Sequence, residues 1–433
     1  GIPAITLSDG PNGVRKQAGA ADHLGLNPSV PATCFPTSSA TACSWDEKLG
    51  EAVGEALGEE AAAQEVAVLL GPGLNIQRSP LCGRDFEYFS EDPILAGKMA
   101  AAYVRGIQKK GIAACPKHFA VNSQELRRMA SDSVVDERTL RELYLTGFEI
   151  VVKEARPKTI MTSYNLINGT YANENAHLLQ DILRKDWGFD GAVVTDWGGS
   201  NDHALGVKNG STLEMPCPGG DSIRELMKAV KDGKVTEADL DARLDELLEL
   251  VLSTHAAVEK APRTFDAAAH HALARRAAAE SIVLLKNEDG ILPLKAGEKL
   301  AVIGDFAQTP RYQGAGSSAV NALQVDALLD CIKADDSGIS FVGYASGFDR
   351  QGAADPKKQE EAVSLAKQAD TVLLCLGLDE LRESEGLDRA DMALAENQQQ
   401  LLDAVAAVNP NVVVLLSAGA PIETPWVGQC RAL

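Results

Sequence analysis

Short apolar segments alternate with amphipathic segments along residues 1–259 of the chain. Five apolar segments have the length of buried strands, and they occupy residues 2–7, 66–70, 112–115, 159–162 and 192–195. Between them, apolar residues recur every fourth position, which predicts helices. These repeats are Leu49, Val53, Leu57 and Ala61, followed by Leu140, Tyr144, Phe148 and Val152. Strands that alternate with helices predict a parallel α/β domain, for which a TIM-like (β/α)8 barrel is the leading candidate.

The boundaries between elements carry further signals. Ser44 and Glu47 have the spacing of a capping box and predict that a helix begins there. A long helix at 237–255 closes the first domain, and Pro262 lies in a linker that we place at 260–275. The alternation then resumes, with predicted strands at 282–285, 300–303, 339–342, 371–376 and 412–416. We therefore expect a second parallel α/β domain at 276–433.

Polar residues follow the predicted strands of the first domain rather than precede them. The segments are SDG at 8–10, KHF at 117–119, SYN at 163–165 and DWG at 196–198. In a barrel, the residues at the carboxyl ends of the strands form the active site. Four such segments on one face of a domain indicate a functional site more strongly than any one of them.

Composition narrows the classes of function. The chain has 433 residues and a formal net charge of −20, and a surface this acidic repels phosphate, so we expect no binding to nucleic acid or anionic lipid. No apolar run is long enough to cross a membrane. The eight cysteines form no CxxC pair and no zinc-spaced cluster, so we predict no metal site and no cofactor. Cys115 and Cys375 lie in apolar runs, which favours a reducing compartment and a cytoplasmic protein.

The charged residues after the strands allow more than one role. Asp196 ends a buried strand and precedes an aromatic residue and two glycines, so it is placed either for a site or for capping the next helix. Lys117 and His118 are suited to binding hydroxyl groups or to keeping a carboxylate ionised. Lys117 is also a candidate Schiff-base lysine. A pair tied into local salt bridges is the structural alternative.

Three loops outside the strands carry weaker signals. Residues 82–93 form a long, charged, aromatic loop of the kind that usually has a function, and Arg84 is its candidate for ligand contact. The acidic residues of that loop are expected to order the loop itself. The loop at 380–389 holds Glu383 and Glu385, but alone it is no different from a solvated acidic loop. The glycine-rich segment 314–318 lacks the lysine of a P-loop, so no nucleotide is inferred.

Six segments of the sequence resemble glycoside hydrolase family 3, in the family's order and over nearly the whole chain. They are SDGPNGVR (8–15), GRDFEYFSEDP (83–93), KHFAVN (117–122), MTSYN (161–165), VTDWG (194–198) and ESEGLDR (383–389). The resemblance implies a TIM-like barrel followed by an α/β sandwich, with the active site between them. It also implies a retaining, exo-acting β-glycosidase that hydrolyses terminal β-D-glucosyl residues of β-glucosides or oligosaccharides.

The resemblance implies roles for individual residues. Asp196 matches the nucleophile, and Glu385 matches the acid/base, with Glu383 as its main competitor. Trp197 would form an aromatic platform for the next sugar, and Ser317 would lie at the rim. The residues that match the family's pocket for the terminal sugar are Asp9, Arg84, Lys117, His118, Arg128 and Tyr164.

The residue types fit this chemistry. Retention requires two carboxyl groups roughly 5–5.5 Å apart, one to attack the anomeric carbon and one to protonate the leaving oxygen. The proposed pair is distant in sequence, so the two domains must pack together to complete the site. We expect Lys117 and Arg84 to keep Asp196 ionised, and a less solvated Glu385 to hold its proton near neutral pH.

Several alternatives stay open. A β-xylosidase of the same family is the nearest, although the FAVNSQE and SDGPNG runs look more like β-glucosidases. The N-acetylglucosaminidase branch is disfavoured, because KHF here continues with AVN rather than with proline. From other classes, a barrel lyase with Lys117 as Schiff base and a non-catalytic sugar-binding protein are the rivals.

The ends of the chain suggest that it is incomplete. It begins at Gly1 directly on a predicted strand and ends a few residues after the predicted strand at 412–416. A parallel sheet needs its faces and edges covered. We therefore expect that a further C-terminal segment or a second chain completes the second domain. The sequence does not decide the oligomeric state, and a homo-oligomer is compatible with it.

Overall fold

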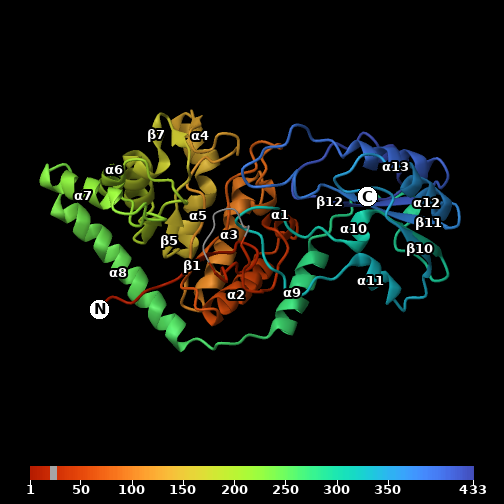
Figure 1. Ribbon diagram of the computed structural model, residues 1–433, viewed down its shortest axis with the longest axis horizontal. Coiled ribbons are helices and arrows are strands. Elements are labelled where there is room, and N and C mark those ends of the chain that lie inside the picture. The colour runs from red at the N-terminus through yellow and green to blue at the C-terminus, as the bar shows by residue number, and fades with distance from the viewer. Residues whose placement is uncertain (20–26) are drawn as a thin grey trace.

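The computed structural model describes residues 1–19 and 27–433, which form two lobes lying side by side (Figure 1). The first lobe runs from β1 (Leu7–Asp9) to α8 (Glu237–Lys260). The second lobe contains the strands from β9 (Lys299–Ile303) onward. Both lobes combine helices with parallel strands, so the predicted α/β fold class is confirmed.

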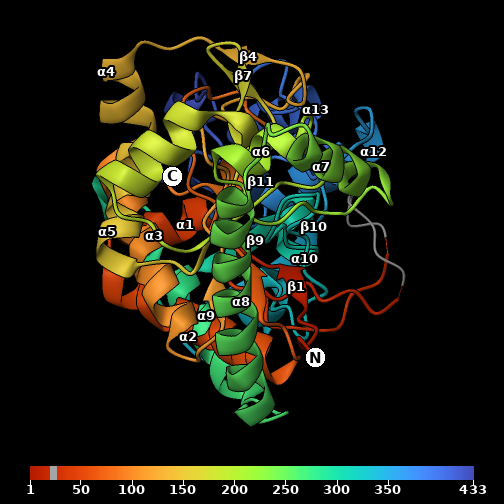
Figure 2. The same cartoon turned by 90° about the vertical axis from the view of Figure 1, so that its left-hand side faces the viewer.

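The connection between the lobes is partly helical. Helix α8 runs along the outside of the first lobe and faces the viewer in Figure 2. From its end the chain crosses below the first lobe to α9 (Ala267–Glu280), which packs against α2 (Glu47–Ala63). Helix α9 therefore occupies part of the segment 260–275, for which the sequence predicted a linker.

Parallel strands form one arc in the middle of the first lobe. In spatial order they are β1, β2 (Val68–Leu70), β3 (Ala113–Ala114), β5 (Thr159–Met161) and β8 (Ala192–Val194). The two sheets of this arc are joined by a hydrogen bond from the Met161 N–H to the Pro116 carbonyl, at 3.0 Å. Four of the five predicted strands coincide with observed strands. The closed, eight-stranded barrel stays a prediction.

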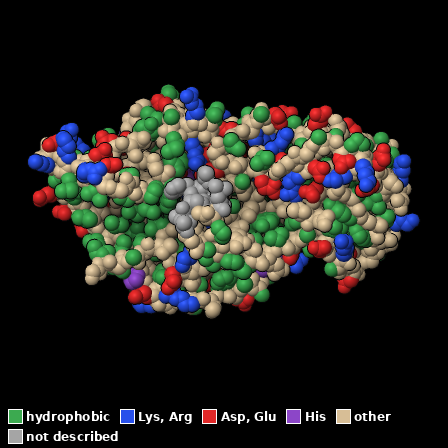
Figure 3. Space-filling view, viewed as in Figure 1, with side chains coloured by type: hydrophobic (Ala, Val, Ile, Leu, Met, Phe, Trp, Pro, Cys, Tyr) green, Lys and Arg blue, Asp and Glu red, His purple; other side chains and the backbone are tan. Residues whose placement is uncertain are grey.

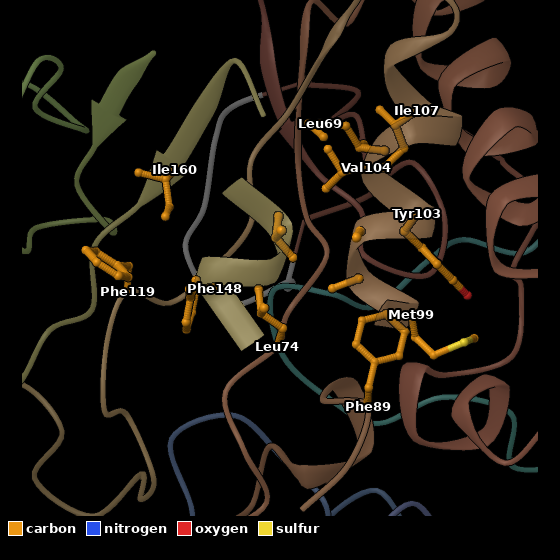
Figure 4. Packing of buried hydrophobic residues seen from close by; sticks show 14 of the residues in the cluster. Leu69, Leu74, Phe89, Met99, Tyr103, Val104, Ile107, Phe119, Phe148 and Ile160 are labelled. Atoms are coloured by element: carbon orange, nitrogen blue, oxygen red, sulfur yellow. The ribbon is translucent and has the colours of Figure 1, made fainter. Parts of the chain in front are cut away.

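Helices cover the outside of the arc. The further elements of this lobe are α1 (Ser38–Ala42), α3 (Pro93–Gln108), β4 (Asp132–Ser133), α4 (Glu137–Thr139), a π-helix (Leu140–Tyr144), α5 (Thr146–Ala155), β6 (Leu166–Ile167), β7 (Thr170–Tyr171), a second π-helix (His177–Asp186), α6 (His203–Asn209) and α7 (Asp221–Lys231). Leu140, Phe148 and Val152 are buried, so the predicted apolar face is confirmed. Phe119 and Phe148 meet edge to face in this core, with ring centroids 5.2 Å apart (Figure 4).

Two local predictions for the first lobe are wrong. The strand expected at 2–7 begins only at Leu7, because Ile2 is 70% exposed and the ladder with β2 starts at the Leu7–Val68 pair. The capping box of Ser44 is also absent. Helix α2 is capped by Asp46, whose carboxylate accepts from the Lys48 N–H, and the Ser44 hydroxyl instead accepts from the Asp46 N–H.

The second lobe is a four-stranded parallel sheet in the order β10-β9-β11-β12. Its strands besides β9 are β10 (Ser340–Ala345), β11 (Thr371–Gly377) and β12 (Val412–Ser417), and its helices besides α9 are α10 (Asp305–Gln308), α11 (Leu328–Lys333), α12 (Pro356–Ala366) and α13 (Glu396–Ala406). Acidic and basic side chains are mixed over the visible face of this lobe (Figure 3). Four of its five predicted strands are confirmed.

The fifth predicted strand of the second lobe, at 282–285, is wrong. Its four side chains are between 51% and 71% exposed, and the segment forms no strand ladder. Its only backbone bond to another segment, among the described residues, joins the Leu285 N–H to the Leu433 carbonyl at 2.8 Å. The apolar and β-branched composition of this segment was therefore not enough to make it a strand, because a strand also requires a neighbour with which to pair.

Two loops dock the lobes onto each other. The carboxylate of Asp388, in the second lobe, accepts hydrogen bonds from the N–H groups of Gly83, Glu125 and Leu126 in the first lobe. These bonds are 3.1, 2.9 and 2.8 Å long. The Arg389 N–H donates to the Leu81 carbonyl at 2.8 Å. The loop around Glu385 is thereby held against the carboxyl ends of the first-lobe strands.

Candidate active site

A cavity of about 240 Å³ opens where the two lobes meet. Nine of the ten predicted site residues line it, namely Asp9, Arg84, Lys117, His118, Tyr164, Asp196, Trp197, Ser317 and Glu385. Arg128 is the exception. Its guanidinium contacts two lining residues instead, at 4.8 Å from the Tyr164 ring centroid and hydrogen-bonded to Glu385. The cavity therefore brings together residues that are up to 376 positions apart, from Asp9 to Glu385.

The first lobe supplies its residues from the carboxyl ends of neighbouring strands. Asp9 ends β1, Lys117 follows β3, and Asp196 follows β8. Since parallel strands end at the same edge, these side chains converge although they come from distant parts of the sequence. The second lobe supplies Glu385 and Ser317 from two loops that hydrogen-bond to each other.

Asp196 lies in a buried position at the cavity wall. One carboxylate oxygen accepts from the Trp197 N–H at 2.7 Å, and the other faces Nε2 of His118 at 3.6 Å. That second oxygen has no hydrogen-bond partner among the described residues. Burial raises the pKa of Asp196, while Arg84 and Lys117 act in the opposite direction. The two cations act in the predicted direction, and desolvation outweighs them, so the pKa lies above its ordinary value; that Asp196 stays ionised remains a prediction.

Lys117 forms an ion pair with Asp9, with 3.2 Å between Nζ and Oδ1. Burial alone would lower the pKa of Lys117, but Asp9 and Glu87 outweigh it, and the pKa lies above its ordinary value. The ammonium group is therefore protonated at neutral pH. A Schiff-base lysine must lose this proton before it attacks a carbonyl, so the site disfavours that reaction.

His118 is held rigidly and is neutral. Its backbone N–H donates to Asn75 Oδ1 at 2.7 Å, and its carbonyl accepts from Asn75 Nδ2 at 2.8 Å. Its Nδ1 lies 3.1 Å from the Tyr88 hydroxyl. Burial, and then the positive charges of Arg84 and Lys117, hold the pKa of His118 well below its usual range. A neutral imidazole carries only one N–H, so the role of the Tyr88 hydroxyl at Nδ1, as donor or acceptor, decides whether the nitrogen that faces Asp196, Nε2, carries the proton.

Glu385 lies between two arginines. One oxygen is 2.8 Å from Arg128 Nη1 and 3.7 Å from Arg84 Nη1, and the other accepts from the Ser317 N–H at 2.7 Å. Burial raises the pKa of this carboxyl, but Arg84 and Arg128 outweigh burial and hold the pKa well below its usual range. The expectation that Glu385 holds its proton near neutral pH is therefore wrong for this arrangement, because burial here comes with two cations.

Glu383, the competitor of Glu385, lies elsewhere. Its side chain is fully buried, pairs with Arg311, and accepts from the Gly419 N–H at 2.9 Å. It does not line the cavity. Residues 383 and 385 would share one face of a regular strand, but a turn at 385–386 interrupts the segment, and Glu385 enters the cavity while Glu383 enters the second lobe.

Three residues that support the site were not singled out from the sequence. Asn75 and Tyr88 orient His118, and Glu125 bonds both Arg128 and the loop of Glu385. Tyr88 follows Arg84 in a loop already marked as functional, which was a usable signal. Asn75 and Glu125 act across loops that meet only in the folded chain. The described residues include no cluster of three metal-ligating side chains, and none of their helices has the length and apolarity to span a bilayer.

Comparison with known proteins places this chain in a family. The glycosyl hydrolase family 3 N-terminal domain matches residues 22–250, and the C-terminal domain of the same family matches residues 282–433. The chain belongs to glycoside hydrolase family 3. The resemblance found in the six sequence segments is thereby confirmed.

Relatives and solved structures agree with this assignment. The chain is 46% identical to thermostable beta-glucosidase B of Acetivibrio thermocellus and 46% identical to an exo-alpha-(1->6)-L-arabinopyranosidase of Bifidobacterium longum, with all of this chain covered in both. The crystal structure of the Bifidobacterium adolescentis GH3 beta-glucosidase superimposes with a TM-score of 0.93 at 44% identity, over 100% of this chain and 62% of that one. Beta-glucosidase 3B from Thermotoga neapolitana in complex with glucose gives 0.88 at 33% identity, over 99% and 64%. The chain spans 57% and 58% of the two relatives' lengths.

Proposed function

We propose that this protein is a retaining, exo-acting β-glucosidase with Asp196 as nucleophile and Glu385 as acid/base. The observation that carries the proposal is the single cavity that Asp196 lines from the first lobe and Glu385 from the second. Its volume of about 240 Å³ suits one sugar ring better than a chain of sugars. A cavity of this size favours action on terminal residues.

In the first step, an Asp196 oxygen attacks the anomeric carbon while the bond from that carbon to the leaving oxygen breaks. The carboxyl proton of Glu385 passes to the leaving oxygen. In the second step, water attacks the anomeric carbon, Glu385 takes the proton from that water, and Asp196 is released as a carboxylate. Two displacements at one carbon retain its configuration.

The electrostatics of the cavity suit the transition state better than the ground state. Asp196 has an unpaired oxygen in a buried setting, so positive charge that develops at the anomeric carbon would stabilise its carboxylate strongly. His118, held neutral, can donate a hydrogen bond without adding charge. The Lys117–Asp9 pair offers donors and acceptors for hydroxyl groups of the sugar.

Two relatives of equal identity favour different sugars, so a second candidate substrate is a terminal α-L-arabinopyranosyl residue. Arabinopyranose is a pentose without the hydroxymethyl group of glucose. A β-xyloside lacks the same group. A pocket that bonds this hydroxymethyl group would reject both pentoses, because buried polar groups would be left unpaired.

The test is a panel of p-nitrophenyl glycosides that compares β-D-glucoside, β-D-xyloside and α-L-arabinopyranoside. We expect the highest kcat/KM with the glucoside, and NMR of the first-formed sugar should show a retained β configuration. A higher kcat/KM with a pentoside would overturn the glucose preference. An inverted product would overturn the mechanism.

A further inference from the structure

Glu125 is a buried carboxylate at the junction of the lobes. It lies in the first lobe, and its side chain is fully enclosed. One of its oxygens accepts from the Gly386 N–H at 2.7 Å, directly after Glu385 in the chain. Its own N–H donates to Asp388 at 2.9 Å. Glu125 therefore touches the second-lobe loop at two residues that follow the proposed acid/base, Gly386 and Asp388.

Glu125 and Glu385 share one arginine. Nη1 of Arg128 lies 2.8 Å from Glu125 Oε2 and 2.8 Å from Glu385 Oε1. The second cation near Glu385 is Arg84, at 3.7 Å. The other oxygen of Glu125 has no hydrogen-bond partner among the described residues, so most of its interaction is directed at Arg128 and Gly386.

The shared arginine affects how tightly Glu385 holds the proton that it must donate. Two cations beside a carboxyl group stabilise its ionised form and oppose its role as an acid. A second carboxylate bound to the same guanidinium withdraws part of that stabilisation, since the two anions compete for one positive charge and repel each other. Among the described residues, Glu125 is the carboxylate bound to Arg128 besides Glu385.

Resting on the function proposed above, we propose that Glu125 is a positioning residue for the acid/base. Through the Gly386 N–H it fixes where Glu385 stands, and by competing for Arg128 it increases the affinity of Glu385 for its catalytic proton. In the glycosylation step that proton moves from Glu385 to the leaving oxygen, while Glu125 forms and breaks no covalent bond.

The surroundings of both carboxyl groups define how the effect depends on pH. Glu125 is faced by Cys82, Arg84, Tyr88, Arg128, Glu385 and Asp388. Glu385 is faced by Arg84, Arg128, Tyr164, Asp196 and the Ser317 N–H. Burial raises the pKa of Glu125 to about 7, so its charge changes near neutral pH.

The decisive variant is Glu125→Gln, which keeps an oxygen for the Gly386 N–H but removes the charge. Without that charge, Arg84 and Arg128 stabilise the Glu385 carboxylate unopposed, so the alkaline limb of kcat/KM should move to lower pH by about one unit. Hydrolysis of cellobiose, a poor leaving group, should fall by about tenfold at pH 7. Hydrolysis of an activated 2,4-dinitrophenyl β-glucoside should change less than twofold, because that leaving group needs little protonation.

The matched control is Glu60→Gln. Glu60 is also fully buried and also accepts from a backbone N–H, that of Thr33 at 3.0 Å, but it pairs with His270 away from the cavity. The pH profile of kcat/KM for the Glu60→Gln variant should match that of the unaltered protein. If Glu125→Gln does not fold, Glu125→Asp replaces it. The shorter side chain should shift the limb in the same direction by a smaller amount.

An unshifted alkaline limb in the folded Glu125 variant, or an equal shift in Glu60→Gln, overturns the proposal and leaves Glu125 as a docking residue. Glu385→Ala separates this result from failure of the proposed function. If that variant retains full cellobiose hydrolysis, the acid/base assignment itself is wrong and both proposals fall. If it loses cellobiose hydrolysis while the Glu125 limb is unshifted, only the role of Glu125 falls.

Discussion

The two halves of the cavity hold their carboxyl groups in opposite ways. In the first lobe, Asp196 stands at the end of a buried strand with one unpaired oxygen, and burial raises its pKa. In the second lobe, Glu385 stands on a loop, bound by Arg128 and the Ser317 N–H, and its pKa is lowered. Both carboxyl groups are desolvated and both lie near cations, so burial alone does not explain the difference; the direct contacts of Glu385 with Arg128 and with the Ser317 N–H do.

The two carboxyl groups therefore differ in what fixes their position and in what sets their pKa. The strand end fixes Asp196 through the backbone of the first lobe, whereas Glu385 depends on the docking of two lobes and on charges from both. We therefore expect substitutions at Asp196 to act on the chemistry alone. Substitutions around Glu385 should act on the chemistry and on the pH dependence together.

The largest effect is expected for Asp196→Ala. Loss of the proposed nucleophile should lower kcat on the order of 10⁴-fold or more, because the other groups of the cavity cannot form the covalent intermediate in its place. In the unaltered protein, a 2-deoxy-2-fluoro-glucoside should accumulate a covalent adduct, and peptide mapping by mass spectrometry should locate the sugar on Asp196. A label on another carboxylate would show that a residue other than Asp196 is the nucleophile.

The next effect compares the two glutamates of the second-lobe loop. Glu385→Ala should lower cellobiose hydrolysis by about 10²–10⁴-fold, and an activated glucoside much less. Azide should restore turnover and yield a β-glucosyl azide. Glu383→Ala should instead reduce stability, because it leaves Arg311 and the Gly419 N–H unpaired. Azide rescue in the Glu383 variant would reverse the assignment.

A third carboxyl group, that of Asp85, tests how strongly burial raises a pKa in this protein. Both of its oxygens lack hydrogen-bond partners in the described part of the chain, and burial, followed by Glu383, raises its pKa to about 8. Between about pH 4 and pH 8 the folded protein then holds a proton here that the unfolded chain has lost, so this group lowers stability as pH rises.

Asp85→Asn removes that dependence. The difference in free energy of unfolding, variant minus unaltered protein, should grow with pH through this window by up to about 1.4 kcal/mol per unit and level off above pH 8. Denaturant unfolding between pH 5 and pH 9 measures it. Asp46→Asn, at the half-buried cap of α2, is the control and should give a constant difference. An equally constant difference for Asp85→Asn would mean that its side chain is ionised throughout.

The smallest effect is expected at Tyr88, which faces the imidazole beside Asp196. Tyr88→Phe removes the hydroxyl near His118 Nδ1 and frees the choice of tautomer. A net hydrogen bond of about 1 kcal/mol corresponds to a roughly fivefold loss in kcat/KM for the glucoside. The control is Tyr344→Phe, in the second lobe, whose hydroxyl has no partner in the described part of the chain. ¹⁵N NMR of His118 should show the change in tautomer; an unchanged spectrum would exclude Tyr88 from this role.

Much of the first half of the cavity was predictable from local sequence. The strand before Asp196 is a buried apolar run, Lys117 and Tyr164 follow similar runs, and Asp9 ends the short strand β1, so the common edge of parallel strands placed all four side chains together. Predictions from local sequence were wrong where a neighbouring residue or a missing partner strand determined the structure. Asp46 took the helix cap expected at Ser44, and the run at 282–285 found no partner strand.

The sequence by itself determined the strand-helix alternation, the buried strands that end in polar residues, and the family. These follow from periodicity and from ordered motifs, which depend on residues close together in the chain. The tertiary structure alone decided that Glu385 rather than Glu383 lines the cavity, and that the pKa of Glu385 is lowered while that of Asp196 is raised. A pKa depends on every charge within a few ångströms, and the charges around Glu385 come from residues more than 250 positions away, which only the docking of the two lobes brings together.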